Sequence, residues 1–235
     1  LWNDRTSDYF SWNVGGGEAG KATLANNVER TIAGRANASY EFVKGHRLNA
    51  NYLYNRFTRD VIDPLLPAAE QDLTETRFLT KQIIGLSYDA SFFKSKLKTS
   101  VFGKYYFQNV SLKNPVKVNN QLTQETVDKT VDNKGFGAAI SYSLHSKIVV
   151  QTSYEKAIRM PESSELLGNT SDNVEAAYNL RPETANNFNL GFNFGPFEKN
   201  HHIFRSDINF FFRDIRDMIM RGAETTNTGN YSLKN

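Results

Sequence analysis

The chain has 235 residues, of which 39% are hydrophobic, so it is too apolar to be intrinsically disordered and long enough for one large all-β domain or two ordinary ones. It has no cysteine, which excludes a disulfide-stapled module, a thiolate metal site and a cysteine nucleophile. Its 28 basic and 25 acidic residues give a net charge of +3, which is too balanced to indicate a nucleic-acid partner. No apolar run reaches the length of about 18 residues that a transmembrane helix needs, whereas a membrane-spanning strand needs only about 9 to 11 and leaves no such run.

Apolar and polar residues alternate along eight stretches of the chain. In chain order these stretches predict four hairpins, 32–42 with 48–54, 84–92 with 97–107, 136–144 with 148–154, and 188–194 with 204–212. The period of two is that of a pleated strand, whose successive side chains point to opposite faces, and a helix of period 3.6 cannot produce it. Six large residues break the alternation, and we interpret them as inner-facing aromatics, packed interior positions or local bulges: Leu53, Phe57, Ile83, Phe102, Tyr106 and Phe211.

Short and long connections alternate between these strands. The turns inside the hairpins take a few residues, whereas polar connections of roughly 60–76, 113–134 and 161–183 separate the hairpins. Outer-membrane barrels have both features, with short periplasmic turns, long extracellular loops, an apolar face toward lipid and a polar lumen. The sequence therefore predicts an all-β fold, an antiparallel up-and-down meander of long strands that forms part of a transmembrane β-barrel.

The most specific pattern lies in the second half of the chain. SYEKAIRMPE at 153–162 is followed by ELLG at 165–168, NLRPETANNFNLG at 179–191 and FFFRDIRDMI at 210–219. In order, spacing and strand pattern these segments resemble the TonB-dependent receptor family, although Arg181 stands where Lys is common and Glu162 where small residues are frequent. The resemblance implies a nutrient receptor with a barrel of about 22 strands and a separate N-terminal plug domain.

On this resemblance, residues 1–235 hold about eight or nine of the strands, and we expect the plug domain and the C-terminal strands to be absent from them. The resemblance also implies contact with outer-membrane lipid and lipopolysaccharide, with the TonB complex through the absent plug, and with a small-molecule or oligosaccharide ligand. An isolated fragment exposes strand edges and an apolar face, so we expect it to self-associate. No nucleic-acid partner and no cofactor are expected.

Acidic residues gather in two of the long connections. Carboxylates there favour cationic or metal-bearing ligands, or divalent ions that bridge to lipopolysaccharide, and a tyrosine can stack on sugars. A second interpretation stays open, in which these side chains only keep the loops solvated. The candidate ligand-binding residues are Asp63, Asp72, Glu162, Glu165, Asp172, Tyr178 and Glu183.

Catalysis is not expected. All four histidines, His46, His145, His201 and His202, fall in the short turns, and no serine, histidine and carboxylate converge at the outer rim. The sequence thus predicts a receptor in the outer membrane of a Gram-negative bacterium that imports a siderophore, cobalamin or an oligosaccharide with TonB-derived energy. The alternative is a non-transporting surface barrel or adhesin, and an outer-membrane enzyme ranks third.

Overall fold

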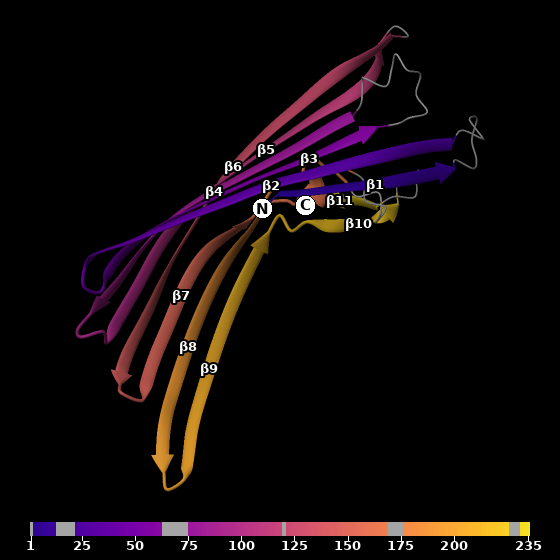
Figure 1. Cartoon of the computed structure of the whole chain (residues 1–235). Helices are drawn as coiled ribbons and strands as arrows, with labels where there is room; N and C mark the ends of the chain where they lie inside the picture. The colour runs from indigo at the N-terminus through magenta and orange to yellow at the C-terminus, as the bar shows by residue number, and fades with distance from the viewer. Residues whose placement is uncertain (1, 13–21, 63–74, 119–120, 169–175, 226–230) are drawn as a thin grey trace.

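Nine strands form one antiparallel sheet in chain order in the computed structural model, which describes residues 2–12, 22–62, 75–118, 121–168, 176–225 and 231–235 (Figure 1). The strands are β1 (Trp2–Trp12), β2 (Ala22–Val43), β3 (His46–Ile62), β4 (Glu75–Phe92), β5 (Leu97–Val118), β6 (Gln121–His145), β7 (Ile148–Arg159), β8 (Glu183–Lys199) and β9 (His202–Arg216). A second sheet pairs β10 (Met220–Thr225) with β11 (Tyr231–Lys234), and one short helix, α1 (Ser163–Leu166), lies between β7 and β8. The all-β antiparallel meander is confirmed.

The strand register places the alternating apolar residues on one face. A single row of cross-strand partners runs over eight strands through Tyr40, Leu48, Tyr88, Val101, Ala138, Tyr154, Phe188 and Phe212. Large members of this row are strongly exposed, with Tyr40 at 68% and Phe212 at 66%. A contiguous apolar surface of this extent is untypical of a soluble monomer and needs an apolar environment. We call this side the apolar face and the opposite side the inner face.

The residues that break the alternation lie on the inner face. Leu53, Ile83 and Tyr106 are direct partners across β3, β4 and β5, and the register of these strands is unbroken there, so they are not bulges. Phe57 and Ile83 pack against buried clusters, whereas Phe211 is 81% exposed. The interpretation as inner-facing residues is therefore confirmed, and packing explains only some of them.

The expected connection at 113–134 is wrong. Instead, β5 continues to Val118 and β6 begins at Gln121, and the two strands pair throughout, as in Leu112 with Val127. Residues 123–128 are exposed to solvent, where a strand needs no apolar face, so polar residues are tolerated there and the alternation of apolar and polar residues is lost. β-Branched residues nevertheless favour extended backbone here: Val116, Val118, Thr123, Thr126, Val127, Thr130 and Val131.

Two parts of the sheet separate at β6 and β7. Their pairing ends at Phe136 with Lys156, while β7 and β8 remain paired as far as Arg159 with Glu183. Figure 1 shows β7, β8 and β9 diverging from the strands that precede them. This separation leaves room for the β7–β8 connection to fold over the inner face. Within the described residues no helix is long and apolar enough to cross a membrane.

Candidate functional site

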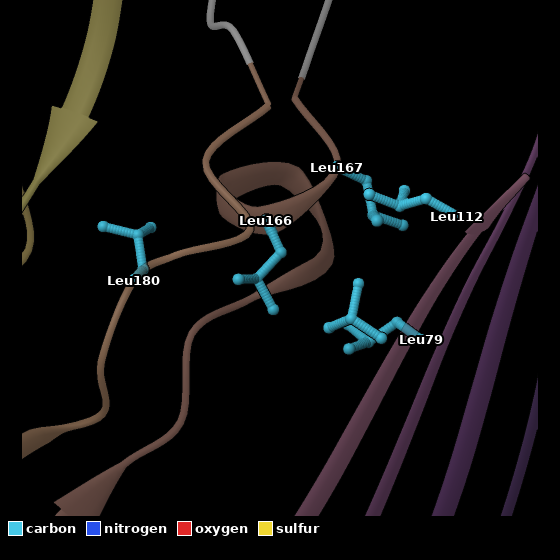
Figure 2. Packing of buried hydrophobic residues seen from close by; sticks show 6 residues of the cluster. Leu79, Leu112, Leu166, Leu167 and Leu180 are labelled. Carbon is cyan, nitrogen blue, oxygen red and sulfur yellow. The ribbon is translucent and has the colours of Figure 1, made fainter. Parts of the chain in front are cut away.

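The β7–β8 connection packs on the inner face of the sheet. We call its described residues, 160–168 and 176–182, the inner loop. Leu166, Leu167 and Leu180 of the inner loop are 3%, 0% and 5% exposed, and they form one buried cluster with Leu79 and Leu112 of the sheet (Figure 2). The main apolar core of the described chain therefore lies between the inner loop and the inner face of the sheet. A sheet whose inner face met only water would have no such core.

Side chains from four strands also hold the backbone of the inner loop. Arg59 Nη1 donates to the Gly168 carbonyl at 2.9 Å, and Arg77 donates to the Leu167 carbonyl. Gln108 Nε2 donates to the Pro161 carbonyl at 2.9 Å, and Lys129 Nζ donates to the Tyr178 carbonyl at 3.1 Å. A loop without regular structure leaves carbonyl groups without backbone partners, and buried carbonyls need a donor. β3, β4, β5 and β6 supply these donors.

Arg59 and Arg77 lie directly opposite each other on adjacent strands. Two like charges in such a pair destabilise a sheet unless acceptors compensate for them. Arg59 pairs with Glu29 at 2.8 Å, and Arg77 pairs with Glu75. With one carboxylate each, both guanidinium groups can direct their remaining donors to the carbonyls of residues 167 and 168.

Arg159 joins three segments at the outer end of β7. Its Nη2 lies 2.6 Å from Glu165 Oε1 in α1, and its Nη1 lies 3.1 Å from Glu183 Oε1 at the start of β8. Glu165 Oε2 also accepts a hydrogen bond from the Glu162 backbone N–H at 2.8 Å, and Glu183 Oε1 accepts one from the Ile219 N–H at 2.8 Å. These bonds fix the beginning and end of the inner loop and the segment after β9 to a single guanidinium group.

The segment from β9 to β11 is tied to the same assembly. Arg181 Nη2 lies 2.6 Å from Asp217 Oδ1, and the Arg181 N–H donates to Asn235 Oδ1 at 2.7 Å. Asn235 Nδ2 donates to the carbonyls of Arg181 and Asp217. Ile219 and Leu233 pack against the leucine cluster. The inner loop is therefore bound on one side by the sheet and on the other by the β10–β11 hairpin.

The family model described as TonB dependent receptor-like, beta-barrel matches residues 1–235. The chain belongs to this family. Its members are transport receptors of the Gram-negative outer membrane, and the residues that Arg159 connects come from the receptor motif noted in the sequence. The comparison with curated proteins gave no match.

Solved structures of receptors and transporters have a similar fold. The hemophore receptor HasR of Serratia marcescens, solved in complex with its hemophore HasA and heme, superposes with a TM-score of 0.57 at 16% identity, covering 100% of this chain and 40% of HasR. The copper transporter OprC gives 0.62 at 12% identity, covering 100% and 38%. The FrpB iron transporter of Neisseria meningitidis, F3-3 variant, gives 0.60 at 14%, covering 99% and 35%. The chain thus spans about two fifths or less of the length of these proteins.

The structure brings part of the expected receptor site together. Glu165 and Glu183 meet at Arg159, and Glu162 precedes α1 with its own N–H bonded to Glu165. The Tyr178 side chain is 40% exposed, while its carbonyl accepts the Lys129 bond. Asp63, Asp72 and Asp172 lie outside the described residues. Ligand binding by any of the seven stays a prediction, but Glu165 and Glu183 already have a cationic partner.

The residues that hold the inner loop were not predicted from the sequence. Gln108 was expected on the polar side of its strand, whereas Lys129 falls in the stretch 113–134 that was expected to be a connection. The partners of all four side chains, Arg59, Arg77, Gln108 and Lys129, lie about 50 residues or more away along the chain, so no local pattern indicated them. Across the described residues, no three histidine, cysteine or carboxylate side chains lie close enough to hold a metal ion. The histidines lie at hairpin turns, at the end of the sheet opposite to Arg159: His46 begins β3, His145 ends β6 and His202 begins β9.

Toward those turns the inner face of the receptor is polar and hydrogen-bonded. Asn49 accepts a bond from Ser39 Oγ at 2.8 Å and donates to Asp89 Oδ2 at 2.8 Å, and Ser100 Oγ donates to Asp89 Oδ1 at 2.7 Å. This network crosses four strands, β2 to β5. A wall of this kind can face water or a polar protein surface at little desolvation cost, because its groups already have partners.

Proposed function

We propose that this chain forms part of the barrel of an outer-membrane receptor that binds a scarce nutrient at its outer loops and imports it with energy delivered through TonB. The proposed nutrients are a siderophore, cobalamin or an oligosaccharide. Family membership supports transport as the activity, and proteins of the same fold are described as a heme-associated hemophore receptor, a copper transporter and an iron transporter.

One observation carries the proposal, namely the row of apolar partners that crosses eight strands on one face. The opposite face carries the network of Asn49, Asp89 and Ser100. A sheet with these two faces suits a wall between acyl chains and an aqueous lumen, since lipid-facing and lumen-facing residues alternate in membrane barrels.

The unpaired edges support a longer barrel. The strand order runs from β1 to β9, and these two strands do not pair with each other in the described sheet. Unpaired backbone groups are costly in lipid, so a spanning sheet must close. We propose that further barrel strands and a plug domain belong to the same protein, with residues 1–235 as a partial barrel.

Within the outer loops, we propose ligand contact for five of the seven candidate side chains. These are Asp63, Asp72, Glu162, Asp172 and Tyr178. Glu165 and Glu183 are instead assigned to holding the inner loop, because each lies within ion-pair distance of the same guanidinium group.

The test is uptake by the full-length receptor in a Gram-negative strain that lacks its other receptors of this family. Radiolabelled ferric siderophores, cobalamin and oligosaccharides are supplied with and without functional TonB, and TonB-dependent accumulation of one of them is expected. An Asp63→Asn/Asp72→Asn/Asp172→Asn variant should weaken binding, and Glu198→Gln near a hairpin turn is the matched control. Binding that never leads to TonB-dependent accumulation would contradict the proposal and favour the adhesin.

A further inference from the structure

The apolar face carries a groove near the β2–β3 and β4–β5 turns. The groove has a volume of about 650 Å³. Its lining includes the small residues Ala50 and Gly103 and the larger residues Tyr40, Leu48, Leu86 and Tyr88. Tyr40 and Leu86 are 68% and 62% exposed, so the sides of the groove are open to the surroundings. Its shape and apolar lining suit a hydrocarbon chain.

An aromatic cluster with one polar pair extends from the groove toward the turns. His46 Nδ1 and Tyr88 Oη are 2.7 Å apart, and the rings of Phe42 and Phe92 lie beside His46, with centroid distances of 6.0 and 5.3 Å. All four residues share the parity of the apolar face. Aromatic side chains with a polar tip are typical of the level where acyl chains meet headgroups.

The turns beyond this cluster are basic. Lys44 lies in the β2–β3 turn, and Lys94 and Lys96 lie in the β4–β5 turn, all three exposed. Across the part of the chain that the structure describes, none of these ammonium groups forms an ion pair. The nearby carboxylate of Glu41 is engaged by the Gly45 N–H at 2.9 Å and by Arg47 at 3.5 Å. The positive charge at this edge is therefore available to an anionic group.

The spacing between groove and turns matches one lipid leaflet. Leu86 precedes Phe92, the last residue of β4, by six residues, which is about 20 Å along a strand at about 3.4 Å per residue. A strand tilted by about 40° covers about 16 Å of membrane depth over that length. The hydrocarbon of one leaflet is about 15 Å thick, so the lysines of the turn beyond Phe92 lie at the level of the headgroups. A lipid whose phosphate contacts the turn lysines would thus place its acyl chain in the groove.

We infer that this surface is a binding site for one anionic phospholipid of the periplasmic leaflet. Its headgroup contacts Lys44, Lys94 and Lys96, its phosphate or ester region meets the His46–Tyr88 pair, and one acyl chain occupies the groove over Ala50 and Gly103. The assignment to this leaflet rests on the proposed function, which places the short turns in the periplasm. The three unpaired lysines favour a lipid with a net negative charge over the zwitterionic lipids that surround the receptor.

The test is native mass spectrometry of the full-length receptor with palmitoyl-oleoyl phosphatidylglycerol or phosphatidylcholine as the probe. The unmodified receptor should retain phosphatidylglycerol in preference to phosphatidylcholine. Each lysine near an anionic headgroup contributes about fivefold in affinity, so Lys94→Gln/Lys96→Gln should weaken phosphatidylglycerol binding about 25-fold and phosphatidylcholine binding little. Lys147→Gln/Lys199→Gln, which removes two charges at the other turns, should change neither.

The groove is tested separately with two glycines of the apolar face. A Cβ at Gly103 or at Gly34 meets no heavy atom within 4 Å, so leucine fits at both positions. Gly103→Leu fills the groove and should weaken binding of both lipids about tenfold or more, whereas Gly34→Leu lies outside the groove and should have no effect. Heat-dependent migration in gel electrophoresis verifies that each variant folds. If a lysine variant does not fold, the salt dependence of the unmodified receptor replaces it, and its retention of phosphatidylglycerol must fall with rising salt.

Equal retention of the two lipids, equal loss in the control variants, or retention of lipopolysaccharide in place of phosphatidylglycerol would overturn the site. Uptake by the same variants separates this inference from the proposed function. A receptor that imports its nutrient but shows no lipid preference refutes only the site. Conversely, selective lipid retention without any import refutes only the proposed transport activity.

Discussion

Leu167→Ala is expected to release the inner loop from the sheet without unfolding the sheet itself. Leu167 is fully buried against the cluster that contains Leu79 and Leu112. Because the inner face borders water and not lipid, the truncated side chain loses hydrophobic transfer energy and leaves a cavity as well. Leucine-to-alanine changes at such positions cost about 2–5 kcal/mol. We take about 3 kcal/mol, since a loop can partly collapse around the cavity.

Hydrogen exchange followed by mass spectrometry measures this effect on the full-length receptor. A loss of about 3 kcal/mol raises the open fraction of the loop more than a hundredfold. The amides of Leu167, Ala177 and Leu180, which donate to Ser163, Leu166 and Ala177, should therefore exchange about a hundred times faster. The amides paired between β4 and β5 should keep their protection, because most of their partners lie in the sheet.

Leu144→Ala provides the control. Leu144 is 60% exposed on the apolar face, where lipid is as apolar as leucine and replaces the lost contacts, so its effect should stay within about 0.5 kcal/mol. Unchanged exchange of the inner loop in Leu167→Ala would refute the argument that the leucine cluster holds it. Equal loss of protection across β4 and β5 would refute the claim that the loop opens independently of the sheet.

Three further predictions follow from the same structure. Arg159→Met leaves two half-buried carboxylates without their cation and should destabilise the inner loop by about 1–2 kcal/mol in the same exchange measurement, whereas Arg216→Met, which removes a 73% exposed side chain, should do little. Phe210→Arg, on the apolar face, should cost about 2–4 kcal/mol of folding stability, measured by urea titration in phosphatidylcholine vesicles. Asn209→Arg, on the inner face, should cost far less, and similar losses for the two variants would contradict the assignment of faces. Residues 1–235 expressed alone should form dimers or larger species by light scattering, because β1 and β9 are unpaired edges; a stable monomer in water would count against this.

The positions of most strands and the assignment of their faces followed from the sequence alone. In a wall between lipid and water every strand obeys the same alternation, so the pattern around Phe188 or Tyr40 could be recognised without knowing its neighbours. Motif residues such as Arg159, Glu165 and Glu183 were also recognised as a group. Their mutual ion pairs were not foreseen, because spacing along the chain does not reveal which charges neutralise one another.

Only the tertiary structure decided where the β7–β8 connection lies and how far β5 and β6 extend. Arg59 and the carbonyl of Gly168 are 109 residues apart, and the leucines of the inner loop meet partners on β4 and β5. Such contacts depend on the separation of β7 from β6, which no local pattern records. Residues 123–128 of β6 are exposed to solvent, so no buried face imposed an alternation there that the sequence could display.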